Sequence, residues 1–147
     1  MPASAINILP GPTVQVYSVT QPAAGAAISY TVPAGHAQSI LGLSCTYAAS
    51  AHAGHRSPLI TMSDANGNIL MQNAISSSYI SPTQTATFTF SSAADALSLT
   101  GPLVFNTTIP TRLVVPPLGT ITITATNLDV ADQFSAIVVE MLDYIAM

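Results

Sequence analysis

Charged side chains are scarce in this chain, and lysine is absent. Two arginines and six acidic residues make up 5% of the 147 positions, whereas an ordinary soluble domain is about 25% charged. The surface must therefore consist mainly of uncharged polar side chains, chiefly the 16 serines and 17 threonines, or be covered by other subunits. The composition favours a component of an assembly over a free monomer.

Positive charge is scarce, and long apolar runs are missing. With two arginines and a formal net charge of −4, the chain has too few cations to neutralise several phosphates, so we expect no nucleic-acid partner. No stretch approaches 18 consecutive apolar residues, and the start Met1-Pro2-Ala3-Ser4 has neither the basic segment nor the apolar run of a signal peptide. We therefore expect neither a membrane span nor secretion through a signal peptide.

Cysteine occurs once, at Cys45, which excludes a disulfide within the chain. Cys45 alternates with Leu41, Leu43 and Tyr47 in an apolar pattern. We expect a small buried thiol at this position. The length of the chain fits one domain with a core of its own.

Metal-ligand patterns are incomplete. The histidines, at positions 36, 52 and 55, have no acidic or thiolate neighbour in the sequence, and a structural zinc site normally needs four ligands. The segment Asp64–Asn68 has its glycine at the fourth position instead of the sixth position of a calcium loop, and Asn66-Gly67 is typical of a hairpin turn. We expect no metal or organic cofactor on one subunit, and a flexible polar loop at Ala48–Ser57. A three-fold assembly that gathers three copies of one histidine stays open.

Catalytic motifs are missing as well, and we expect no enzymatic activity. Asp129 and Asp132 have the spacing of a loop or short cap that satisfies backbone N–H groups. The chain has no Gly-x-Ser-x-Gly turn and no glycine-rich phosphate loop. Carbohydrate binding stays a weaker alternative, because there is no tryptophan and only Tyr79, among five tyrosines, lies in a predicted loop.

Period-two alternation between glycine and proline breaks predicts an all-β fold. We expect a single-domain antiparallel β-sandwich, jelly-roll-like, at residues 13–147, preceded by an N-terminal arm at residues 1–12. The predicted strands are Thr13–Thr20, Ala26–Val32, Gln38–Tyr47, Leu59–Ser63, Ile69–Asn73, Thr83–Phe90, Leu103–Asn106, Arg112–Val115, Thr120–Thr126 and Phe134–Ile145.

The alternation also predicts which face of each strand meets solvent. Threonines occupy one face of Thr83–Phe90 and of Thr120–Thr126, and apolar residues occupy the other, as in half-buried strands. The last strand is apolar on both faces, with Phe134, Ala136 and Val138 on one and Ile137, Val139 and Met141 on the other. A strand of this kind is covered on both sides. The core covers one side, and a neighbouring subunit or a loop of the same chain covers the other.

Two further features are candidates for subunit contact. Ile6, Ile8 and Leu9 have no hairpin partner in the sequence, so this arm docks on another chain or forms a frayed end or an edge strand. Glu140 interrupts the most apolar strand, and we expect it to pair, with Arg112 as the favoured partner, or to lie at a subunit boundary. The residues predicted to lie at a subunit or shell interface are Ile6, Ile8, Leu9, Arg112, Ile137, Val139, Glu140 and Met141.

Several segments together resemble small β-sandwich virion proteins of tailed bacteriophages. They occur in order over most of the chain: Tyr30-Thr31-Val32-Pro33-Ala34-Gly35, the hairpin Asp64–Asn68, Val115-Pro116-Pro117-Leu118-Gly119-Thr120, and Asp132-Gln133-Phe134 leading into Val139-Glu140-Met141-Leu142.

The resemblance implies a capsid decoration or cement protein. Such proteins commonly have a jelly-roll-like fold and bind as homotrimers to the outer surface of the shell, where the partner is the major capsid protein. The resemblance thus implies a location on the virion. The alternative is a tail or fibre component that binds a host-surface glycan.

Overall fold

The computed structural model describes residues 11–74, 79–92, 103–110 and 112–145. These residues form nine β-strands and no helix. The strands are β1 (Thr13–Ser18), β2 (Ile28–Thr31), β3 (His36–Ala48), β4 (Pro58–Ser63), β5 (Ile69–Ala74), β6 (Thr85–Ser92), β7 (Val104–Ile109), β8 (Thr120–Ala125) and β9 (Gln133–Ile145).

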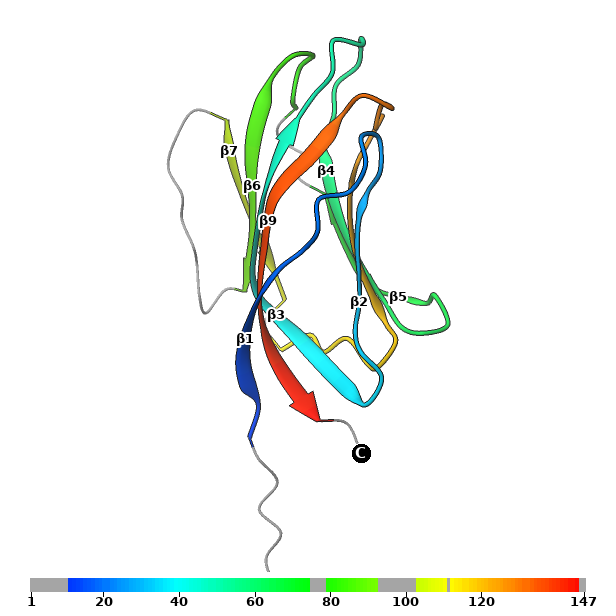
Figure 1. The fold of residues 1–147 in the computed structure, drawn as a ribbon, viewed down its shortest axis with the longest axis vertical. Helices are drawn as coiled ribbons and strands as arrows, with labels where there is room; N and C mark the ends of the chain where they lie inside the picture. The colour runs from blue at the N-terminus through cyan, green and yellow to red at the C-terminus, as the bar shows by residue number, and fades with distance from the viewer. Residues whose placement is uncertain (1–10, 75–78, 93–102, 111, 146–147) are drawn as a thin grey trace, which may run out of the picture.

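The strands form two sheets packed face to face (Figure 1). One sheet has the order β1-β9-β3-β6-β7, and the other has the order β2-β8-β4-β5. The strand pairs are nested along the sequence, with the hairpin β4–β5 in the middle. Outside this hairpin β3 pairs with β6, then β2 with β8, and finally β1 with β9. These nested antiparallel pairs, rolled into two sheets, make a jelly roll, to which β7 adds a strand parallel to β6.

The core fills the space between the sheets because each strand turns alternate side chains inward. Tyr47 lies at its centre, with ring centroids 4.8 Å from Phe134 and 5.9 Å from Phe88. Cys45 is buried beside these rings as a free thiol, as the apolar alternation predicted. Burial raises the pKa of its thiol to about 12.

Every predicted strand but one is present, with ends shifted by a few residues. The predicted strand Arg112–Val115 is wrong, because among the described residues of this segment only Val115 makes a ladder contact, a single bridge to Gln38. Arg112 has a positive φ of 65°, which is incompatible with an extended strand. The hairpin at Asp64–Asn68 is confirmed: the Asp64 carboxylate accepts hydrogen bonds from the backbone N–H groups of Asn66 and Asn68.

The predicted faces of the last strand need correction at one position. Strand β9 carries an extra residue opposite Ser44–Thr46 of β3, and Ala136 has a positive φ of 47° there. This β-bulge reverses the alternation, so Phe134 and Ile137 both face the core. Ile137, Val139 and Met141 therefore belong to the core of the subunit, which contradicts their predicted role as subunit contacts.

The threonine faces are confirmed in β8, where Ile121 and Ile123 are buried between half-exposed threonines. In β6 the prediction fails at Thr89, which is fully buried although it lies on the outer face. Its hydroxyl has no hydrogen-bond partner within the described part of the chain.

The turn Pro116–Gly119 fixes the start of β8 against β2 and β4. Gly119 accepts a hydrogen bond from Val32 N–H, and Leu118 N–H donates to the Val32 carbonyl. A Cβ atom at Gly119 would lie 2.6 Å from the Ser63 carbonyl oxygen and 2.7 Å from a Val115 methyl group. Only glycine therefore fits between these two segments.

We predict that Gly119→Ala lowers the free energy of unfolding by about 1–3 kcal/mol, the cost of forcing extra volume into a packed site. Gly11→Ala is the matched control, because nothing lies within 4 Å of the Cβ position there. Urea denaturation of both variants checks this. Equal stabilities of the two would contradict the packing described at the turn.

Candidate functional site

A buried ion pair between Arg56 and Asp132 lies at one end of the sandwich. Both residues are 1% exposed, and Arg56 Nε lies 3.1 Å from Asp132 Oδ2. Asp132 accepts further hydrogen bonds from the Tyr47 hydroxyl at 2.6 Å and from the Ser50 N–H at 2.7 Å. The Asp129 N–H also donates to it at 2.8 Å. The carboxylate thus accepts hydrogen bonds from four residues, which lie in two stretches of the chain, the end of β3 with the loop after it and the loop before β9.

Arg56 is satisfied just as fully. Its Nη1 donates to the carbonyl oxygens of His52 at 3.0 Å and Gly54 at 2.7 Å, and its Nη2 donates to Ser50 Oγ at 3.0 Å. The guanidinium therefore organises the loop that contains it. The prediction of a flexible loop at Ala48–Ser57 is wrong in this respect, because the end of that loop is held in place against Asp132.

The donors around Asp132 set its protonation. Burial opposes the charged form, but the hydrogen bonds from Ser50, Tyr47 and Asp129 and the Arg56 guanidinium outweigh burial. Together they hold the pKa of Asp132 well below its usual range. The pair is closed to solvent, so its chemistry is that of a structural clamp.

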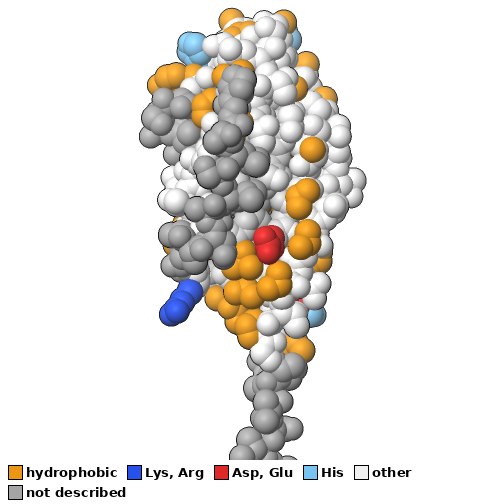
Figure 2. Space-filling model, turned by 90° about the vertical axis from the view of Figure 1, so that its left-hand side faces the viewer, with side chains coloured by type: hydrophobic (Ala, Val, Ile, Leu, Met, Phe, Trp, Pro, Cys, Tyr) orange, Lys and Arg blue, Asp and Glu red, His pale blue; other side chains and the backbone are white. Residues whose placement is uncertain are grey.

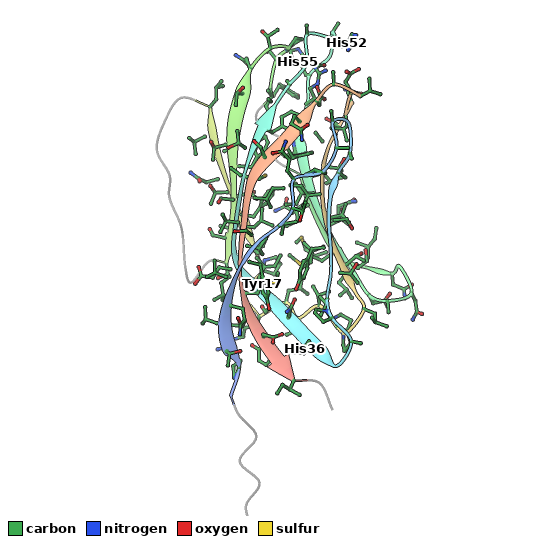
Figure 3. The ribbon with its side chains drawn as sticks, viewed as in Figure 1. Tyr17, His36, His52 and His55 are labelled. Carbon is green, nitrogen blue, oxygen red and sulfur yellow. The ribbon has the colours of Figure 1, made fainter. Side chains whose placement is uncertain are left out.

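Two histidine–carboxylate contacts lie at opposite ends of the molecule (Figure 3). His52 Nδ1 lies 2.8 Å from Asp129 Oδ1, and His36 Nδ1 lies 2.9 Å from Asp143 Oδ2. Each histidine thus has an acidic neighbour that its sequence position does not reveal. Within the described residues no group of three or more His, Cys, Asp or Glu side chains could hold a metal ion.

The end that carries His52 and His55 also presents an aromatic side chain. Tyr79 is 59% exposed, and its ring lies 5.2 Å from that of His55. Tyr79 lies outside the strands, as its predicted place in a loop requires. The described residues thus show an exposed aromatic ring packed against an imidazole.

An exposed apolar surface covers the two strands at one edge of the larger sheet. We call it the β1/β9 outer face, and it consists of Val14, Val16, Val138, Glu140 and Leu142. The register places Val14 opposite Leu142 and Val16 opposite Glu140, so these side chains are neighbours on one face. Val14, Val16 and Val138 are 57%, 66% and 42% exposed. Figure 2 shows hydrophobic side chains gathered around an acidic one on this side of the molecule.

The predicted contact residues fare differently. Ile6, Ile8 and Leu9 lie outside the described residues. Glu140 is exposed on the β1/β9 outer face, and Arg112 is exposed in the segment that follows β7. Neither forms an ion pair within the described part of the chain, so the predicted Arg112–Glu140 pair does not form inside one subunit.

Sequence reasoning missed Val14 and Val16 as surface residues. The strand itself was predicted, but the alternation of the valines with Thr13, Gln15 and Tyr17 gave no sign that they take the outward face. Tyr17 takes the inward side instead and packs against the ring of Tyr30 at 5.9 Å. The pairing that places Val16 opposite Glu140 is seen only in the structure.

Comparison of the chain with protein-family models, with curated proteins and with solved structures finds no match. In the part that the structure describes, no helix is long and apolar enough to cross a membrane.

We predict that Asp132→Asn lowers the free energy of unfolding by about 3–5 kcal/mol, because it leaves the Arg56 guanidinium buried without a counter-charge. The lowered pKa of Asp132 also gives a sign to the pH dependence. Its ionisation contributes stability that is present above its unfolded pKa of about 4 and is lost as the pH falls further. Wild type should lose stability from about pH 5 downward more steeply than Asp132→Asn.

Urea denaturation between pH 3 and pH 7 checks this, with the exposed turn variant Asp64→Asn as a control that should lose much less stability at neutral pH. Equal losses of stability in the two variants would show that the buried ion pair contributes no more to stability than the turn carboxylate of Asp64.

Proposed function

We propose that the protein is a non-enzymatic virion structural protein, a capsid decoration or cement protein that binds the outer shell as a homotrimer. The β1/β9 outer face is the observation that carries the assembly part of this proposal. The other parts of the proposal rest on the resemblance to small virion proteins of tailed phages. These parts are the location on the virion, the three-fold symmetry and the major capsid protein as partner.

The β1/β9 outer face suits association because its valines lie together. Val14 and Val16 are successive outward residues of β1, and Val138 on β9 lies opposite Ser18, diagonal to Val16. Contiguous apolar surface of this kind marks interaction sites when it lies on a soluble domain. Removing it from water is favourable by about 25 cal/mol per Å² of apolar area.

The free edge of β1 also favours contact with another chain at this part of the molecule. Within the described strands β1 pairs only with β9, so its other edge presents unpaired backbone N–H and C=O groups. Natural edge strands are usually protected by charge, proline or a bulge. Strand β1 has none of these between Thr13 and Ser18. An edge in this state is well suited to contact with another chain.

A glycan-binding tail or fibre component is the second candidate. The exposed ring of Tyr79 beside His55 favours it, because sugar sites use aromatic platforms. The two functions differ in copy number: a cement protein is present in many copies per particle, whereas a tail component is present in few. Quantifying the chain in purified particles discriminates between them.

We predict that wild type has a mass three times that of the 15.1 kDa chain in light scattering at micromolar concentration. Val16→Asp should raise the dissociation constant by tenfold or more, since it places an unpaired carboxylate in the apolar contact, about 1.4 kcal/mol or more. Ile69→Asp is the matched control on the other sheet, at a residue that is 61% exposed, and should keep the trimer. A stable wild-type monomer would refute the proposal, and a dimer would refute its three-fold part.

A further inference from the structure

Glu140 lies among the apolar side chains of the β1/β9 outer face. Val16 lies directly opposite it on β1, and Val138 is the next outward residue along β9. Covering this face would take the carboxylate out of water, and a buried charge without a partner costs several kcal/mol. A surface that covers the face therefore needs to present a cation or hydrogen-bond donors to Glu140, and a cation also neutralises its charge.

The chain itself offers one fixed cation for this purpose. Of its two arginines, Arg56 is buried against Asp132. Arg112 is exposed and, within the described residues, forms no ion pair. It follows β7, the strand at the opposite edge of the sheet from β1. A basic side chain protrudes at the rim of the same side of the molecule that carries the acidic one (Figure 2).

We infer that Glu140 of one subunit pairs with Arg112 of a second copy of this chain. The inference rests on the proposed function, since it takes the β1/β9 outer face as the contact between subunits. Charge complementarity selects a second copy as the occupant, because within the described residues Glu140 and Arg112 are an exposed anion and an exposed cation without an ion-pair partner.

The pair joins two different surfaces of the subunit. One is the outer face of β1 and β9, and the other is the segment after β7. Such a head-to-tail contact closes into a ring when its rotation matches the symmetry. In a trimer it occurs three times, and each subunit gives one carboxylate and one guanidinium.

Charge reversal tests the pair directly. Arg112→Glu and Glu140→Arg should each raise the dissociation constant of the trimer tenfold or more, because each places like charges in contact. The double variant Arg112→Glu/Glu140→Arg restores opposite charges and should assemble within about threefold of wild type. Light scattering over a dilution series measures all three, and far-UV circular dichroism confirms that each variant is folded.

Mixing the two single variants tests the ring size. An interface between the two variants is complementary, and an interface between identical variants is repulsive. A ring of three subunits always contains at least one pair of identical neighbours. An equimolar mixture should therefore fail to restore the trimer that the double variant forms. Full restoration of assembly by mixing would show a ring with an even number of subunits. This result would overturn the three-fold ring.

Gln72→Glu and Gln72→Arg are the charge controls, because Gln72 is exposed on β5 of the other sheet. Both should assemble as wild type does. If Val16→Asp dissociates the trimer while the charge reversals do not, the pair is overturned and the proposed function stands. Failure of the double variant to assemble also overturns the pair. A wild type that is monomeric at every concentration overturns both.

Discussion

The buried pair of Arg56 and Asp132 is the constraint on which one end of the molecule depends. It joins the loop after β3 to the loop before β9, and Tyr47 links it to the aromatic core. Replacing a buried ion pair by apolar residues is often neutral, but removing one partner is costly. The pair therefore holds the two loops in one arrangement more than it adds net stability. It also uses one of the two arginines, which leaves Arg112 as the fixed cation available for contact.

The jelly roll divides the chain into an apolar interior and a mostly neutral exterior. The bulge at Ala136 decides this division along β9, because it turns Phe134, Ile137, Val139 and Met141 inward together. The alternate set on β9 then faces outward beside the valines of β1. An apolar outward face on a chain with few charges is consistent with the proposal that the protein is a subunit of an assembly.

The regular part of the fold could be predicted from the sequence, and the irregular part could not. Period-two alternation gave the strands of both sheets, and Asn66-Gly67 gave the hairpin between β4 and β5. The bulge in β9 could not be predicted, because it depends on pairing with β3, more than 80 residues away in the sequence. Arg56 was hidden for the same reason, since its carboxylate partner lies 76 positions later in the chain. Local patterns specify faces and turns, whereas these two features arise only when distant strands meet.

The central claim is that the β1/β9 outer face is covered in solution. Carbene footprinting at concentrations below and above assembly measures this residue by residue. The account predicts that labelling of Val14, Val16 and Val138 falls as the concentration rises, while labelling of the exposed Ile69 and Leu70 on the other sheet stays constant. Labelling of the three valines that does not change with concentration, or that falls together with labelling of Ile69 and Leu70, would contradict it.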